Sequence, residues 1–93
     1  MKVKRVEFSK KFEKELRHAP LKIKVAFRNK LKIFCTDKYN LALNNHALAG
    51  KYLEYRSINT TSDRRAIYRE FDGGEVVHFA IIGTHSKLYK KSS

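Results

Sequence analysis

The side chains that could do chemistry gather at the end of one apolar segment. Residues 76–82 are apolar apart from His78, and they lead directly into Gly83-Thr84-His85-Ser86-Lys87-Leu88-Tyr89. Histidine transfers protons near neutral pH, because its ordinary pKa is about 6.5, and glycine lets the backbone turn. A buried strand holds the side chains at its end in fixed positions. The sequence therefore predicts a functional site where this segment ends.

Other polar side chains complete the set of groups needed to cut RNA without a metal. The ribose 2′-OH attacks the adjacent phosphorus, so an enzyme has to remove that proton, protonate the leaving 5′-oxygen and stabilise the charge on phosphorus. Histidine can make either proton transfer, and arginine can bind phosphate through two hydrogen bonds at once. The candidate catalytic residues are His85, His46, Asp63, Arg65 and Tyr89.

Each candidate also has a structural interpretation. A histidine such as His85 can cap a turn, and Tyr89 can cover the core with its hydroxyl in water. Asp63 can stabilise a turn or orient Arg65. His78 lies inside the strand and is interpreted as structural. Few carboxylates are present and no two histidines have short ligand spacing, so no metal site and no cofactor are expected.

The charge of the chain points to a polyanionic partner. Its formal net charge is +12, and residues 1–34 hold 12 Lys and Arg against 3 acidic residues. Self-repulsion on this scale opposes compaction, and nucleic acid is the partner that such a surface favours over simple solvation. The candidate RNA-binding residues are Lys22, Lys24, Arg28, Lys30, Arg56, Arg64 and Lys87.

Length and cysteine content place the chain in a broad class. Its 93 residues are expected to form one domain, 1–93. Cys35 is the only cysteine, which excludes an internal disulfide and fits a reducing cytosol. No apolar segment reaches the roughly 18 residues of a membrane span, and no signal peptide opens the chain. A soluble cytoplasmic protein without membrane contact is expected.

The N-terminal half is predicted to form a strand and two helices. Met1–Phe8 alternates as a strand does, and Ser9 is a good N-cap for a short helix that ends at residues 18–20. Pro20 suits the first turn of a second helix, which should end near Thr36. Apolar residues at spacings of four, four and three form one stripe along this helix: Ile23, Phe27, Leu31 and Phe34.

The C-terminal half is predicted to form three strands. A linker with some helical potential, residues 37–51, precedes segments with strand character at residues 53–59, 65–71 and 76–82. Asp72-Gly73-Gly74 supplies the positive φ angles of a tight hairpin, so the second and third strands should pair antiparallel. The third strand should be central and covered on both faces. The predicted fold class is α+β: an N-terminal strand and a two-helix hairpin packed on an antiparallel sheet with a three-strand C-terminal meander.

Several motifs in this order resemble the RelE/ParE toxin superfamily, and its YafQ-like branch most of all. The most specific parts are His46-x-Leu48-x-Gly50 and the Gly-Thr-His-x-x-Leu-Tyr ending at residues 83–89. Three further segments match: residues 8–12 (Phe-Ser-Lys-Lys-Phe), 55–58 (Tyr-Arg-Ser-Ile) and 63–68 (Asp-Arg-Arg-Ala-Ile-Tyr). The resemblance therefore covers nearly the whole chain.

The resemblance implies a RelE-like fold and the toxin of a type II toxin–antitoxin pair, a metal-independent endoribonuclease that cuts messenger RNA on the ribosome. By position, His46, Asp63, His85 and Tyr89 match the functional residues of the YafQ-like branch, and Arg65 matches a phosphate-binding arginine of RelE-like members. The implied partners are an acidic antitoxin, the ribosome and messenger RNA.

The chain departs from the YafQ pattern at three positions. This chain has Asn59 where the YafQ pattern has a histidine, Arg64 where it has a tryptophan, and Ile81 where it has an arginine. Arg65 or Arg64 could replace the missing arginine, and His46 and His85 would then share the proton transfers. Two alternatives remain open at this point: a ParE-like inhibitor of DNA gyrase, and a non-catalytic RNA-binding module.

Overall fold

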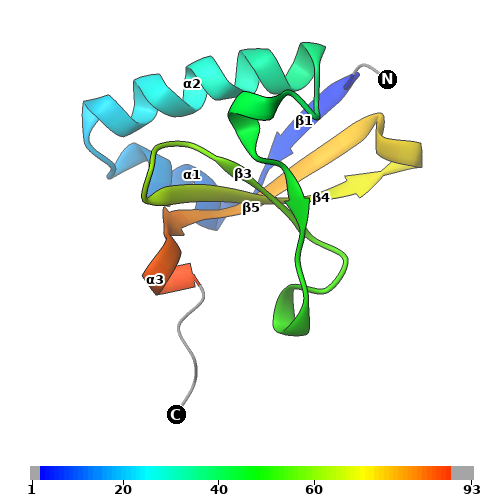
Figure 1. Ribbon diagram of the computed structural model, residues 1–93. Coiled ribbons are helices and arrows are strands. Elements are labelled where there is room, and N and C mark those ends of the chain that lie inside the picture. Colours follow the sequence, from blue (N-terminus) through cyan, green and yellow to red (C-terminus); the bar gives the residue numbers. More distant parts are fainter. Residues whose placement is uncertain (1–2, 89–93) are drawn as a thin grey trace.

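The computed structural model describes residues 3–88, which form a mixed β-sheet with helices against it. In chain order the elements are β1 (Arg5–Phe8), α1 (Lys10–Arg17), α2 (Leu21–Thr36), the 3₁₀ turn η1 (Leu41–Leu43), β2 (His46–Ala47), the 3₁₀ turn η2 (Gly50–Tyr52), β3 (Arg56–Asn59), β4 (Arg64–Phe71), the 3₁₀ turn η3 (Asp72–Gly74), β5 (Val76–Thr84) and α3 (His85–Leu88). In Figure 1, α2 lies across one face of the sheet and α3 projects from the opposite side.

The strand order of the sheet is β1-β5-β4-β3-β2. Strands β2 to β5 pair antiparallel, whereas β1 joins β5 in parallel. The α+β class and the C-terminal meander are confirmed, and the sheet is mixed where a purely antiparallel one was expected. Parallel neighbours need a long crossover connection, and both helices and most of the sheet separate β1 from β5 in sequence. The two-residue strand β2 was not foreseen, because two residues carry no alternation signal.

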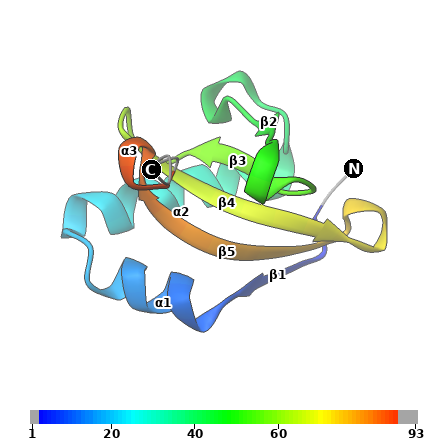
Figure 2. The same ribbon diagram turned by 90° about the horizontal axis from the view of Figure 1, so that it is seen from below.

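Helix α1 covers the edge of β5 beyond the last residue of β1. Ser9 caps the helix as predicted, since its Oγ accepts a hydrogen bond from the Phe12 backbone N–H at 2.9 Å. The same hydroxyl donates to the Ala80 carbonyl at 2.7 Å, and the Ile82 N–H donates to Glu15 Oε1 at 3.3 Å. Side chains of α1 thus satisfy backbone groups that no neighbouring strand reaches (Figure 2).

The core lies between α2 and the sheet and is rich in aromatic rings. Phe27 of α2 meets Phe79 of β5 edge to face at 5.4 Å, and Phe34 meets Tyr68 of β4 at 4.9 Å. Ile23, Phe27 and Phe34 are buried as the stripe predicted, while Leu31 packs at the margin of the core. Pro20 stands one residue earlier than predicted, as the N-cap of α2.

The meander differs from its prediction at two ends. Strand β3 begins at Arg56 and not at Leu53, because η2 and the positive φ of Glu54 (77°) keep the preceding backbone out of an extended conformation. Strand β5 continues to Thr84, and the predicted hairpin forms with φ of 52° at Asp72 and 93° at Gly74. Strand β5 is an interior strand between β1 and β4, as expected, but its two-sided cover is incomplete, since His78 is only half-buried.

Candidate functional site

Polar side chains cluster on the face of the sheet that points away from α2, called here the open face. Side chains alternate between the two faces of a strand, so Ser57 and Asn59 of β3 share this face with Arg65 of β4. The register sets Asn59 beside Arg65, and Arg65 beside Gly83 of β5. His46 of β2 lies opposite Ser57 and adds an imidazole to the same region.

Arg65 is the centre of this cluster and is only 8% exposed. Its Nε donates to Ser57 Oγ and one terminal nitrogen donates to Asn59 Oδ1. The other terminal nitrogen (NH2) lies 3.0 Å from the Asn44 carbonyl oxygen and 3.2 Å from His46 Nδ1. A buried guanidinium is stable only when its N–H groups are matched by acceptors, and Ser57 Oγ, Asn59 Oδ1 and the Asn44 carbonyl supply them. The set Arg65, His46, Ser57, Asn59 and Asn44 is called the Arg65 cluster below.

His46 lies between the Arg65 guanidinium and solvent. The residue is exposed, and its Nδ1 lies 3.0 Å from the Asn44 carbonyl oxygen. In the tautomer that carries its proton on Nδ1, this N–H donates to Asn44 and leaves the Nε2 lone pair free to accept a proton. The arrangement therefore offers a base at the rim of the open face, beside a fixed cation.

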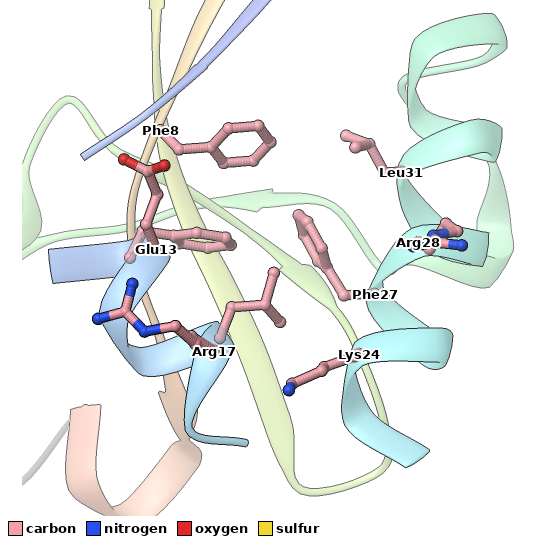
Figure 3. A pocket seen from close by; sticks show the side chains of 9 residues that line it. Phe8, Glu13, Arg17, Lys24, Phe27, Arg28 and Leu31 are labelled. Carbon is pink, nitrogen blue, oxygen red and sulfur yellow. The ribbon is translucent and has the colours of Figure 1, made fainter. Parts of the chain in front are cut away.

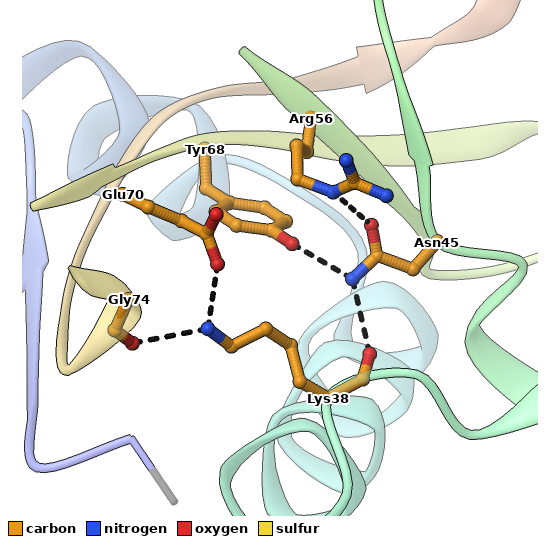
Figure 4. Close-up of polar contacts among 6 residues, drawn as sticks. All are labelled: Lys38, Asn45, Arg56, Tyr68, Glu70 and Gly74. Carbon is orange, nitrogen blue, oxygen red and sulfur yellow. Dashed lines mark hydrogen bonds and ion pairs between the residues drawn. The ribbon is translucent and has the colours of Figure 1, made fainter. Parts of the chain in front are cut away.

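A second network holds the segment that carries His46 (Figure 4). Asn45 Nδ2 donates to the Lys38 carbonyl at 3.0 Å and to Tyr68 Oη at 2.7 Å, while Arg56 Nε donates to Asn45 Oδ1 at 2.9 Å. Lys38 is itself buried, with Nζ 2.5 Å from Glu70 Oε2 and 3.0 Å from the Gly74 carbonyl. Burial raises the pKa of Tyr68 to about 12, so its hydroxyl stays protonated in this network.

Helix α3 starts immediately after β5, close to the Arg65 cluster. Arg64 pairs with Thr84 in the register, and His85 is the first residue of α3. Leu88 is 5% exposed and packs over Gly83. A Cβ added to Gly83 would lie 3.3 Å from Cδ2 of Leu88. The backbone of His85 is thus two residues beyond Gly83, the partner of Arg65. The side chain of His85 and the whole of Tyr89 lie outside what the structure describes.

Asp63 does not join the cluster. It is exposed in the β3–β4 loop, where its Oδ1 accepts a hydrogen bond from Thr61 Oγ1 at 3.0 Å. It lines a small cavity with Lys22 at the start of α2, on the helix side of the sheet. Of the sequence-predicted catalytic residues, the structure therefore brings His46 and Arg65 together and sets Asp63 apart from them.

The candidate RNA-binding residues are spread over several surfaces. Lys30 donates to the Ala42 carbonyl at 3.2 Å, and the Arg56 guanidinium lies 5.4 Å from the ring centre of Tyr39. Arg64 and Lys87 line one cavity at the end of β5. Lys24 and Arg28 stand at the rim of a separate groove between α1 and α2, so the basic candidates do not form one continuous patch.

The groove between β1, α1 and α2 is apolar inside and charged at its rim (Figure 3). Its volume is about 480 Å³, with Phe8, Leu16 and Leu31 among the residues that line it. Arg17, Lys24 and Arg28 stand around it, with Glu13 as the single acidic residue. An apolar surface with a cationic rim fits an acidic amphipathic segment of another protein.

Sequence reasoning did not identify the residues that hold Arg65 and His46. Ser57 is an ordinary strand residue in sequence, and Asn59 stood out only as a departure from the YafQ pattern. The contact of each with Arg65 follows from the register of β3 against β4. Asn44 has a left-handed φ of 45°, a conformation that asparagine tolerates better than most residues. The adjacent pair Asn44-Asn45 was therefore the one available signal of a special turn before His46.

Two further observations concern residues 3–88 only. Within them, no group of three or more His, Cys, Asp or Glu side chains is placed to hold a metal ion. Over the same range, the helices are too short or too polar to cross a lipid bilayer.

Comparison with known proteins identifies the fold. No protein-family model matches the chain, and no curated protein matches it in sequence. YafQ from E. coli strain BL21(DE3) superposes with a TM-score of 0.70 at 20% identity, over 90% of this chain and 96% of that one. The YoeB/ParE toxin from Agrobacterium tumefaciens gives 0.73 at 14% identity, over 91% and 99%.

The E. coli DinJ–YafQ toxin–antitoxin complex also matches, with a TM-score of 0.68 at 21% identity over 94% of this chain and 99% of the matched one. These identities are low, but each superposition spans nearly all of both chains, so the likeness concerns the fold as a whole and not a shared fragment. The chain has the fold of the RelE/ParE toxins, with YafQ among its structural relatives.

Proposed function

We propose that this chain is the toxin of a type II toxin–antitoxin pair and acts as a ribosome-dependent, metal-independent endoribonuclease. The whole of residues 1–93 would form its single toxin domain. Three observations support this: the fold, the net charge of +12, and the Arg65 cluster on the open face. The observation that carries the proposal is the contact between a buried, fixed guanidinium and an exposed imidazole, Arg65 and His46.

The proposed reaction needs two proton transfers and no metal. The 2′-oxygen of the ribose attacks the adjacent phosphorus, the bond from phosphorus to the 5′-oxygen breaks, and a cyclic phosphate and a 5′-hydroxyl remain. His46 Nε2 takes the proton of the 2′-OH, and His85, at the start of α3, gives one to the leaving oxygen. The positive charge of Arg65 stabilises the dianionic phosphorane.

The remaining candidates have supporting roles in this proposal. Asn59, where YafQ-like toxins carry a histidine, accepts a hydrogen bond from Arg65 and cannot transfer a proton at neutral pH. Asp63 orients the nucleotide from the β3–β4 loop, and Tyr89 stacks on a base. The cations of α2, Lys22, Lys24, Arg28 and Lys30, grip ribosomal RNA through its phosphates, together with Arg56, Arg64 and Lys87.

A translation reaction with a defined messenger RNA tests the proposal. The chain should cut that messenger only while ribosomes translate it. His46→Ala should slow cleavage by about 10²–10⁴, whereas His78→Ala, on β5 outside the Arg65 cluster, should not. Arrest of DNA supercoiling by gyrase without cleavage would instead identify the ParE-like alternative, and messenger that is bound but uncut would identify an RNA-binding module.

The proposed partner is an acidic antitoxin encoded beside the chain. Its amphipathic segment would dock in the groove between α1 and α2, with apolar side chains toward Phe8 and Leu16 and carboxylates toward Arg17 and Arg28. Arg17→Glu should weaken the complex because it sets like charges opposite one another. Lys32→Glu, which makes the same charge change on the exposed side of α2, is the control. Equal affinities of the two variants for the antitoxin would contradict docking in this groove.

A further inference from the structure

A second cationic feature lies at the end of β5, around the edge of the sheet from the Arg65 cluster. A cavity of about 540 Å³ opens between α1, the α1–α2 turn and the start of α3. Lys11 and Lys14 reach it from α1, Arg64 from β4 and Lys87 from α3, with His18 nearby. Glu15 is the single acidic residue in its lining, and that carboxylate is engaged with the Ile82 backbone N–H at 3.3 Å.

The cations around this cavity outnumber the acidic residues in its lining and form no salt bridges within residues 3–88. Within the described part of the chain, none of Lys11, Lys14 and Lys87 takes part in a salt bridge, and neither does Arg64. Both α1 lysines are exposed, and their spacing of three residues puts them on one side of the helix. Glu15 is the one negative charge among these four cations, so the lining stays positive and attracts an anion that enters the cavity.

The cavity continues onto the open face. A smaller one of about 180 Å³ shares five lining residues with it, Lys11, Glu15, Ile82, Gly83 and Lys87, and extends to Lys51 and Tyr52 of η2. The two together form one groove, called here the α1–β5 groove, which passes from the open face around the edge of the sheet. Arg64 and Arg65 are neighbours on β4 with side chains on opposite faces, so the groove and the Arg65 cluster meet at the same end of the sheet.

We infer that the α1–β5 groove binds the phosphodiester backbone of the single-stranded RNA that flanks the bond to be cut. Lysine binds phosphate as a point charge and needs no apolar anchor. An acidic peptide, by contrast, gains affinity from buried apolar or aromatic side chains, and Ala19, Pro20 and Ile82 are the apolar residues beside the larger cavity. The choice of RNA as the ligand rests on the proposed function, whereas the choice of a polyanion rests on the groove itself.

The test measures binding and cleavage separately. The probe is a short single-stranded RNA with 2′-O-methyl riboses, which cannot attack their own phosphates, and its fluorescence anisotropy is titrated with the full chain. The groove variant is Lys11→Ala with Lys14→Ala. The control is Lys10→Ala with Lys32→Ala, which removes the same charge from exposed positions of α1 and α2 that line neither cavity. Thermal unfolding establishes that both variants fold.

The groove variant should bind the RNA about tenfold more weakly at low salt. The slope of log affinity against log salt concentration should be smaller in magnitude by about 1.4, because each of the two lost phosphate contacts on a single strand contributes about 0.7. The control should change affinity by about twofold or less. Equal losses in the two variants would overturn the inference, because they would mean that only net charge matters. Loss of binding to an acidic antitoxin with RNA affinity unchanged would also overturn it.

Cleavage in the translation reaction distinguishes this inference from the proposed function. If the chain cuts messenger but its RNA affinity is indifferent to Lys11 and Lys14, the groove inference fails and the proposed function stands. If the groove binds RNA as expected and no messenger is cut, the groove inference stands and the endoribonuclease proposal fails.

Discussion

The guanidinium of Arg65 and the imidazole of His46 meet on the open face of the sheet, with NH2 of Arg65 3.2 Å from Nδ1 of His46. The two are 19 positions apart in the sequence. Both lie within 3.0 Å of the same acceptor, the Asn44 carbonyl oxygen, which therefore fixes their relative position. The left-handed turn at Asn44 is what turns this carbonyl toward them.

Replacement of Arg65 by lysine should destabilise the fold as well as impair cleavage. A single ammonium keeps the charge but cannot donate to Ser57, Asn59 and Asn44 at once, because it lacks the planar fork of arginine. We expect a loss of about 1–3 kcal/mol in the free energy of unfolding. Arg69→Lys, on the same face of β4, alters an exposed ion pair with Glu54 and the contacts of Arg69 with the rings of Tyr55 and Phe71, and should cost about 1 kcal/mol or less. Chemical denaturation of the two variants checks this, and equal stabilities would contradict it.

Replacement of His85 by alanine should remove catalysis and leave folding intact. The loss of a general acid typically lowers the rate by about 10²–10⁴. The measurement is messenger cleavage in a translation reaction, with ribosome binding as the check that the protein is folded. His78→Ala, seven residues earlier on β5, is the matched control. Undiminished cleavage by a folded His85→Ala chain would remove His85 from the mechanism.

Gly83→Ala should impair activity more than stability. Its new Cβ would lie 3.3 Å from Leu88 Cδ2, tighter than an ordinary contact, so Leu88 has to give by a few tenths of an ångström. Because Leu88 is part of α3, we expect this helix to follow and to displace His85. We expect cleavage to fall about tenfold, because small misplacements of a catalytic group are costly. The free energy of unfolding should change by about 1 kcal/mol or less. A second substitution, Leu88→Val, removes the clashing atom and should restore cleavage; without such rescue the explanation is wrong.

The buried Tyr68 should make the fold sensitive to alkali. Burial raises the pKa of Tyr68 from 10.0 to about 12, so the folded state holds its phenolic proton more tightly than the unfolded chain does. The phenolic group therefore does not lower the free energy of unfolding below pH 10. As the pH rises from 10 to 12, its deprotonation in the unfolded chain should lower the free energy of unfolding by about 2 kcal/mol. Urea denaturation across this range measures the loss. In Tyr68→Phe the part of the decline that comes from this hydroxyl should disappear.

The sequence by itself predicted both helices and the strands of the meander, because these elements depend on local patterns, whereas it gave no sign of the two-residue strand β2. The stripe Ile23, Phe27 and Phe34 predicts α2, Ser9 predicts the start of α1, and Asp72-Gly73-Gly74 predicts the hairpin, all through interactions between residues close in the chain. Motif resemblance added the fold, which the superpositions confirm, and it selected His46 and Arg65, which the structure brings into contact.

The tertiary structure decided what depends on register and on distant parts of the chain. The parallel pairing of β1 with β5 follows from a crossover that no local pattern encodes. Asp63 was grouped with the catalytic candidates, but the β3–β4 loop carries it to the start of α2. Ser57 and Asn59 accept hydrogen bonds from Arg65 only because β3 and β4 pair in one register. A shift of one residue would turn these side chains to the other face of the sheet. The α1–β5 groove likewise exists only where α1 packs against the edge of β5, because Lys11 and Lys14 of α1 lie 50 or more residues from Arg64 and Lys87 in sequence.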